Sequence, residues 1–257
     1  MEPDRSRAGH PHESDLCDLR LLHLADSALP IGALAHSFGL ESLTSSGALQ
    51  VGHLPSFLQG YLEEAGLMEA VFCRAAYRLA GSGERWFPVE RWIELNDWLS
   101  ARKPARESCA GSAALGLNFL GAVIALGDFP VLRKALLVVA KNRSADREQP
   151  MSDENRPVVI HHSTAFGLAS GILRFEEDRA VLAFLHQLVA SLVSACQRLL
   201  PLGQTAATRI LWNLKPTLLQ TAQRSAACSL DDARSFMPLL DWAAMEHPAL
   251  STRLFVS

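Results

Sequence analysis

The feature that most constrains the fold is the spacing of apolar residues, which recur every three or four positions along most of the chain. In residues 57–80, and again in residues 180–200, this spacing forms an apolar stripe with the 3.6-residue period of an α-helix. Strand signals are weak, because the β-branched pairs lie among helix formers and no Asn-Gly or Asp-Gly turn occurs. The sequence therefore predicts an all-α fold.

Prolines divide this helical pattern into segments. Several stand just before a helix-like stretch, where a missing backbone N–H costs nothing. We expect about ten helices in a single domain over residues 15–247. Their expected cores are 15–28, 36–47, 55–80, 89–101, 105–126, 129–141, 159–174, 178–200, 202–213, 216–228 and 232–246.

Three segments fall outside the helical pattern. Residues 1–14 are polar and are expected to be disordered, and residues 141–157 are interpreted as an exposed polar loop inside the domain. Residues 248–257 follow a proline that should end the preceding helix, yet they carry leucine and phenylalanine beside a single arginine. An apolar chain end of this kind either docks on its own domain or binds a partner.

Composition excludes several classes of protein. With 49% hydrophobic and 20% charged residues the chain is typical of a globular protein, and a net charge of -3 argues against non-specific nucleic-acid binding. The five cysteines are scattered without a C-x-x-C pair, which indicates free thiols in a reducing compartment. The start has no apolar leader, and no uninterrupted apolar run reaches about 18 residues. We expect a cytoplasmic protein.

Catalytic and ligand-binding signatures are missing from the sequence. It contains no phosphate-binding G-x-x-x-x-G-K-[ST], no H-E-x-x-H and no G-x-S-x-G. No helix offers paired acidic or histidine ligands at the spacing that a metal site needs, so neither a bound cofactor nor a resident metal is expected. For the adjacent His161 and His162 we expect one buried, hydrogen-bonded ring and one exposed ring, since neighbouring helical residues point about 100° apart.

The segment LADSALPIGALAHSFGLESL, residues 24–43, interrupts the apolar pattern. Pro30 and Gly32 would break one helix, and Ser37 stands where its hydroxyl could cap the next. His36 and Glu41 have no catalytic partner at a suitable spacing. We interpret the segment as a bend that positions two helices in an interaction surface.

Three motifs in this order resemble the UreF family of urease accessory proteins. ADSALPIGALAHSFGLE resembles the family's N-terminal motif, FLHQLVASLVSACQRLLPLGQT is similar to its central helix, and STRLFVS resembles its closing S-R-L-F-R-S. Weaker similarity covers HHSTAFGLASGI and the apolar helices between. The chain departs from the family at Thr252 and Val256, and its loop at 141–157 is longer and more polar.

The resemblance implies a non-enzymatic chaperone of urease maturation, built as an all-α homodimer. Such a protein binds a second accessory protein, UreD (UreH in some systems), recruits the GTPase UreG, and helps to insert nickel into apo-urease. The nickel and the nucleotide would be handled by the partners. The tail residues Arg253, Leu254 and Phe255 would make or order the contact with UreD.

The resemblance also implies roles for the other two motifs. Gln204, Thr205 and Arg209 would lie near the shared surface or line a polar path, while the N-terminal motif shapes the bend. Two alternatives remain open on the residues. One is an α-helical enzyme with a site around His36 and Glu41. The other is a nickel-storage protein, whose only candidate ligands are His10, His12 and Cys17.

Overall fold

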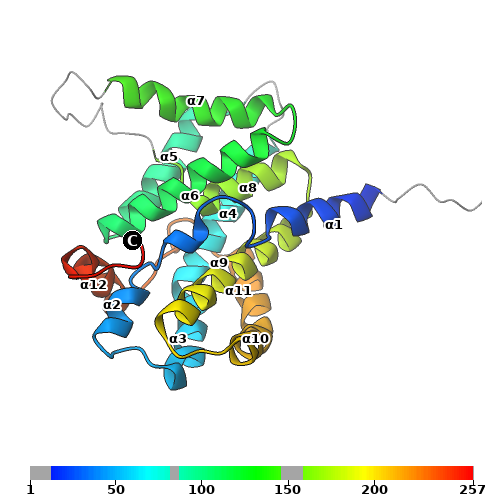
Figure 1. The fold of residues 1–257 in the computed structure, drawn as a ribbon. Coiled ribbons are helices and arrows are strands. Elements are labelled where there is room, and N and C mark those ends of the chain that lie inside the picture. The colour runs from blue at the N-terminus through cyan, green and yellow to red at the C-terminus, as the bar shows by residue number, and fades with distance from the viewer. Residues whose placement is uncertain (1–12, 82–86, 146–158, 257) are drawn as a thin grey trace, which may run out of the picture.

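The computed structural model describes residues 13–81, 87–145 and 159–256, which form a single all-α domain (Figure 1). No strand occurs in these ranges, so the predicted fold class is confirmed. The α-helices are α1 (Glu13–Leu24), α2 (Leu40–Ser45), α3 (Leu54–Tyr61), α4 (Leu67–Ala80), α5 (Val89–Ala101), α6 (Arg106–Ile124), α7 (Pro130–Ala145), α8 (His162–Ile172), α9 (Glu177–Leu199), α10 (Gln204–Asn213), α11 (Lys215–Ala227) and α12 (Pro238–Glu246).

Short helical turns complete the fold. These are the 3₁₀ turns η1 (Ala33–Ala35), η2 (Val51–His53) and η5 (His247–Ala249), and the π-helical segment η3 (Leu62–Gly66). The segment η3 joins α3 to α4, so the helix predicted over 55–80 is present but contains one wider turn.

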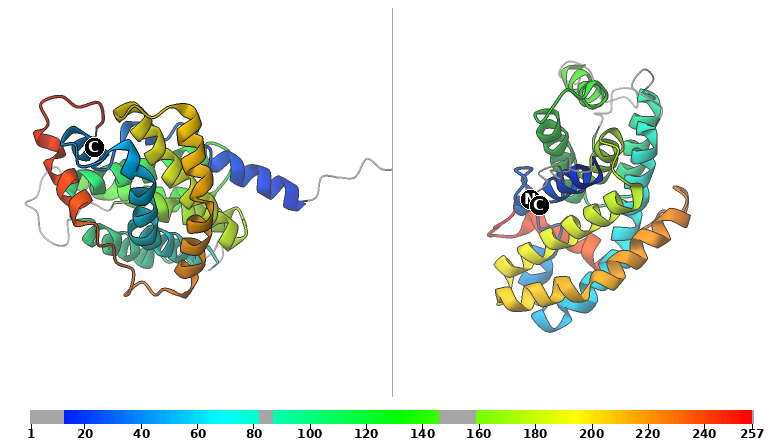
Figure 2. Two further views of the ribbon diagram at one scale, coloured as in Figure 1. Left: turned by 90° about the horizontal axis from the view of Figure 1, so that it is seen from below. Right: turned by 90° about the vertical axis from the view of Figure 1, so that its right-hand side faces the viewer.

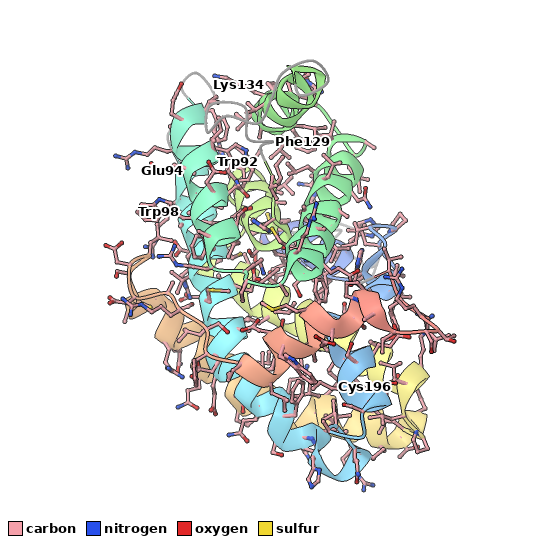
Figure 3. All side chains as sticks on the ribbon, turned by 90° about the vertical axis from the view of Figure 1, so that its left-hand side faces the viewer. Trp92, Glu94, Trp98, Phe129, Lys134 and Cys196 are labelled. Atoms are coloured by element: carbon pink, nitrogen blue, oxygen red, sulfur yellow. The ribbon has the colours of Figure 1, made fainter. Side chains whose placement is uncertain are left out.

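Helices α4, α8 and α9 form the centre of the domain, with α10 and α11 on one side and α5 to α7 on the other (Figure 1). Helix α1 extends from the body of the protein (Figure 2). The largest fully buried side chains include Trp92, Phe119 and Phe166. On α5, Trp92 points inward and Glu94 away from the interior (Figure 3).

A glycine allows the closest helix contact of the core. At Gly167 on α8, a Cβ atom would lie only 2.0 Å from the carbonyl oxygen of Cys73 on α4. The two backbones therefore meet directly, which no larger residue would permit.

Several predicted boundaries are wrong. The first helix ends at Leu24, before residue 28. The second begins at Leu40, after residue 36. The last begins at Pro238, because residues 228–237 run over the surface without helical structure apart from turns. Helix α7 continues through Ala145, into the predicted loop; the rest of that loop, and residues 1–12 of the predicted disordered segment, lie outside the described residues.

Two helices, α6 and α9, are long and apolar enough to span a membrane by length and composition alone. The apolar window of α9 is 56% buried inside the domain, as expected of the core helix that its sequence predicts. All five cysteines are free.

Candidate functional site

The N-terminal motif forms a tight bend between α1 and α2. Gly32 and Gly39 both have positive φ angles, 84° and 90°, which glycine adopts without strain. A Cβ at Gly39 would lie 2.9 Å from the carbonyl oxygen of Leu240, so this glycine also brings α12 against α2. Phe38 adopts a positive φ of 50° despite its bulky side chain, a strained conformation that the surrounding packing must hold.

The expected helix cap at Ser37 is wrong. The helix begins only at Leu40, so Gly39 is the N-cap of α2, and glycine has no side chain that could provide a capping hydrogen bond. Ser37 is completely buried, and its hydroxyl has no hydrogen-bond partner among the described residues. His36 is also buried, with its ring 5.7 Å from that of Phe38, and burial lowers the pKa of His36.

Glu41 receives the C-terminal tail. Its Oε1 atom accepts a hydrogen bond from the backbone N–H of Leu254 at 2.6 Å, and its Oε2 atom accepts one from Phe255 at 3.2 Å. Burial works to raise the pKa of Glu41, but these bonds and one from His247 outweigh it and leave the pKa below its usual value. Glu41 is therefore an ionised anchor for the tail.

His247 follows α12 and links Glu41 to a second carboxylate. Its Nε2 atom lies 2.8 Å from Oε2 of Glu41, and its Nδ1 atom lies 2.6 Å from Oε2 of Glu107 on α6. The other oxygen of Glu107 accepts a hydrogen bond from Arg253 at 3.3 Å. His247 is fully buried. The cluster joins α2, α6, η5 and the tail.

The tail also packs against the end of α9. Phe255 is only 4% exposed, and the guanidinium carbon of Arg198 lies 4.3 Å from the centre of its ring. Arg198 in turn donates a hydrogen bond to the carbonyl of Leu34 in the bend. The backbone N–H of Val256 donates to the carbonyl of Ala35 at 2.8 Å.

Three motifs separated in sequence therefore meet at one place, which we call the tail site: Leu34, Ala35, Glu41, Glu107, Arg198, His247 and residues 253–256. Within it, Phe255 points into the domain, whereas Leu254 and Val256 are 58% and 67% exposed. Arg253 is also partly exposed. The docked tail thus presents a cation and two apolar side chains to the solvent.

The residues Gln204, Thr205 and Arg209 lie on an exposed face of α10, beside a shallow groove of about 430 Å³ that Trp212 also lines. Gln204 accepts a hydrogen bond from Gln197 on α9, next to Arg198 of the tail site. The tail site and this face of α10 are connected through neighbouring residues of α9, so they are adjacent surfaces at one end of that helix rather than a single cluster.

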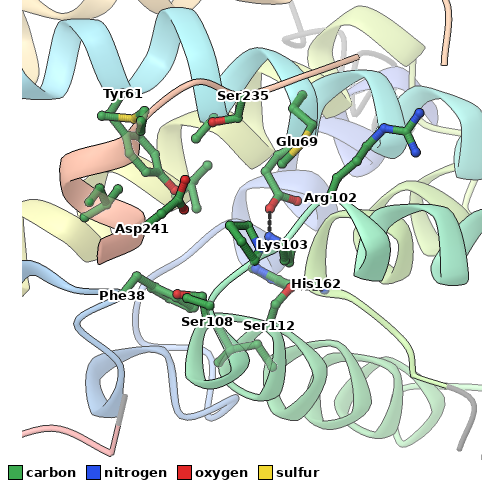
Figure 4. Close-up of a pocket in the computed structure, with 18 of the residues that line it drawn as sticks. Phe38, Tyr61, Glu69, Arg102, Lys103, Ser108, Ser112, His162, Ser235 and Asp241 are labelled. Carbon is green, nitrogen blue, oxygen red and sulfur yellow. Dashed lines mark hydrogen bonds and ion pairs between the residues drawn. The ribbon is translucent and has the colours of Figure 1, made fainter. Parts of the chain in front are cut away.

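A separate cavity of about 90 Å³ lies between α4, α6, α9 and the segment before α12 (Figure 4). Glu69 and Lys103 form a buried ion pair on its wall. Burial alone would raise the pKa of Glu69, but Lys103 lowers it below its usual value. Asp241 also lines this cavity, and burial raises its pKa. Nothing in the sequence indicated that Glu69 and Lys103 pair, because the two residues stand 34 positions apart.

Both histidines of the pair at 161 and 162 are buried, so the predicted exposed ring is wrong. His161 precedes α8, and its ring is hydrogen-bonded to Ser100 and Ser112. His162 packs between the rings of Phe119 and Phe184. Burial lowers the pKa of His161 to about 3 and that of His162 to about 4, so both rings are neutral.

No group of three potential metal ligands occurs among the described residues. Two candidate nickel ligands, His10 and His12, lie outside those residues, and Cys17 is half-buried on α1. In the alternative enzyme site, Glu41 holds the tail through both of its carboxylate oxygens.

The fold and the tail site define a class of protein: a single-domain all-α protein in which three sequence motifs build one docked surface. A sequence model of the UreF family matches residues 50–215. The chain is 30% identical to the urease accessory protein UreF of Thermosynechococcus vestitus, over 95% of this chain and 99% of that protein. It is also 30% identical to the UreF proteins of Rhodopseudomonas palustris, over 93% and 92%, and Corynebacterium glutamicum, over 93% and 98%.

The chain belongs to the UreF family of urease accessory proteins. The resemblance read from the three motifs is confirmed. Membership places the protein among the accessory factors of urease maturation, a chaperone type of protein that works with other maturation proteins.

Proposed function

We propose that this chain is a cytoplasmic assembly chaperone that binds UreD (UreH) and recruits or regulates the GTPase UreG for nickel insertion into apo-urease. The observation that carries the proposal is the tail site, where the N-terminal motif and α9 hold the closing motif in one fixed conformation. A tail that is anchored by Phe255 and Glu41 loses little further freedom when a partner binds it.

The contact with UreD is made by the exposed side of the docked tail. Arg253 and Leu254 contact the partner directly, whereas Phe255 orders the tail from beneath. Arginine and large apolar side chains are common anchors at protein interfaces. Val256 replaces the arginine of the family motif, so Arg253 is the one cation that residues 248–257 contribute.

The exposed face of α10 supplies a neighbouring contact. Gln204, Thr205 and Arg209 lie beside Trp212, which is 73% exposed. An exposed tryptophan next to an arginine is typical of an interface hot spot. We assign this face to a contact with another subunit of the assembly. That assembly includes a homodimer of this chain. Nickel is handled by the partner proteins.

The test is co-purification of this chain with UreD and UreG from the same organism. Full-length protein is compared with a version truncated after His247 and with Arg253→Ala and Leu254→Ala. The exposed substitution Leu126→Ala, far from the tail in sequence, is the control. We expect the truncation and both tail variants to weaken the complex with UreD. Unchanged assembly in all three would overturn the role of the tail.

A second experiment tests the function itself. The full-length gene is introduced into a urease-positive strain that lacks its own UreF, and urease activity and bound nickel are measured in the lysate. Restored activity supports the proposed role. Failure to restore activity, when the chain is folded and UreD and UreG from its own organism are supplied, would contradict it.

A further inference from the structure

The strongest unexplained feature is a fully buried histidine that lies between two carboxylates. Both ring nitrogens of His247 are within 2.8 Å of a carboxylate oxygen, one from Glu41 and one from Glu107. A neutral imidazole carries one N–H and one acceptor nitrogen, so it can donate to only one of them. An acceptor nitrogen facing an ionised carboxylate oxygen at this distance would be repulsive.

The hydrogen bonds around the two carboxylates indicate that both are ionised. Glu41 accepts two tail N–H groups in addition to His247, and a carboxylate with several donors is held in its charged form. Glu107 faces the guanidinium of Arg253. A shared proton would therefore reside on the imidazole, because a carboxylic acid is the stronger acid of the two.

The charge balance of the cluster supports the same arrangement. The charged groups in contact here are Glu41 from α2, Glu107 from α6, Arg253 from the tail and His247 itself. With a charged histidine the two negative and two positive charges cancel. With a neutral ring, a negative charge would remain uncompensated around a fully buried side chain, which is costly.

We propose that His247, as an imidazolium that bridges Glu41 and Glu107, is the positioning residue for the C-terminal tail, so that docking of the tail requires a proton on this ring. The ring itself stays beneath the tail. It holds Glu41 in the orientation that accepts the N–H groups of Leu254 and Phe255, and it holds Glu107 where it meets Arg253.

This inference deepens the proposed function, because it adds a proton-dependent step to the presentation of the tail. Loss of the ring proton removes one charge-assisted hydrogen bond and leaves the two carboxylates facing a neutral ring. The tail then opens, and the surface formed by Arg253 and Leu254 is no longer fixed. Binding of UreD therefore weakens as the pH rises and the ring gives up its proton.

The first test needs no variant. The full-length chain, labelled uniformly with ¹⁵N so that both the histidine rings and the backbone amides are visible, is followed by NMR from about pH 5.5 to about pH 8.5. The backbone amide signals of Leu254 and Phe255 report the docked tail. We expect both nitrogens of His247 to carry protons whenever the tail is docked, and the tail signals to change together with the ring. A neutral ring beneath a docked tail would overturn the proposal.

Variants separate this role from a general structural one. His247→Gln should raise the open fraction of the tail about tenfold or more and remove its dependence on pH between about pH 5.5 and about pH 8.5. Glu107→Gln removes a charge at a partly exposed position and leaves no cavity, so it should weaken tail docking without disturbing the packing of the core. The control is His53→Gln, the same substitution at an exposed histidine on η2. A tail that stays docked with wild-type pH dependence in His247→Gln would contradict the inference.

Binding to UreD is then measured at both ends of the pH range for the wild type and His247→Gln. Tighter binding at low pH in the wild type alone is the expected result. If the tail docks with the ring proton but UreD never binds, the proposed partner is wrong and the positioning role of His247 stands. If UreD binds equally at both pH values while the tail opens, the link between docking and presentation is wrong.

Discussion

Removal of the Phe255 ring should detach the tail without unfolding the domain. The ring is 4% exposed and lies under the guanidinium of Arg198. Burial of a phenylalanine side chain contributes about 1.5–3 kcal/mol, and a cation–π contact at a partly exposed site adds about 0.5–1 kcal/mol. Phe255→Ala should therefore cost tail docking about 3 kcal/mol, which is roughly a hundredfold increase in the open state.

Hydrogen exchange of the tail amides measures this change directly. The N–H groups of Leu254, Phe255 and Val256 are bonded to Glu41 and to the carbonyl of Ala35 only while the tail is docked. Their protection should fall about a hundredfold in Phe255→Ala, whereas protection in α9 should not change. The control Val256→Ala alters an exposed residue of the same tail. A change of less than about threefold at these amides would refute the reasoning.

Three further predictions concern the core, the anchor carboxylate and the buried ion pair. Gly167→Ala should destabilise the domain by more than the roughly 1–3 kcal/mol typical of overpacking, because the new Cβ would lie 2.0 Å from the carbonyl oxygen of Cys73. A lower melting temperature would show this. The control Gly121→Ala adds a Cβ that meets nothing within 4 Å, so it should be neutral or stabilising. Because the pKa of Glu41 is lowered in the folded chain, the ionised carboxylate stabilises the docked tail above the usual carboxyl pKa, and this stabilisation is lost as the pH falls through the pKa that Glu41 has in the folded chain. Amide exchange of the tail should therefore become faster in acid, and Glu41→Gln should abolish this acid dependence. Lys103→Met should lower the free energy of unfolding, measured in urea, by about 3–5 kcal/mol, since it leaves Glu69 buried without its partner. The double variant Lys103→Met with Glu69→Met should lose less stability than Lys103→Met alone. Equal losses in the two variants would contradict the pairing of these residues.

The bend shows where sequence patterns stop being sufficient. Pro30 and Gly32 predict an interruption, and the chain does turn there. The sequence placed the next helix cap at Ser37, but a second positive-φ glycine at position 39 delays the helix. The local capping preference is overridden because the backbone at Gly39 must fit against Leu240 on α12, a residue more than two hundred positions away.

The C-terminal tail also shows where sequence patterns stop being sufficient. The apolar residues of the tail indicated docking or binding without deciding between them. The structure docks Phe255 and leaves Leu254 exposed, since the tail turns one side chain toward the domain and its neighbour toward the solvent. Nothing in the sequence marked Glu107 or His247 as parts of the same site, because their pairing depends on how α6 and η5 cross.

By itself, the sequence determined the all-α class, the core helices and the family, because helical periodicity and short motifs are local properties of the chain. The tertiary structure alone decided that Glu41 anchors the C-terminal tail and that His247 lies between two carboxylates. Those contacts join residues separated by 140 to 214 positions. Their energies depend on burial and on the crossing of helices, neither of which a local pattern contains.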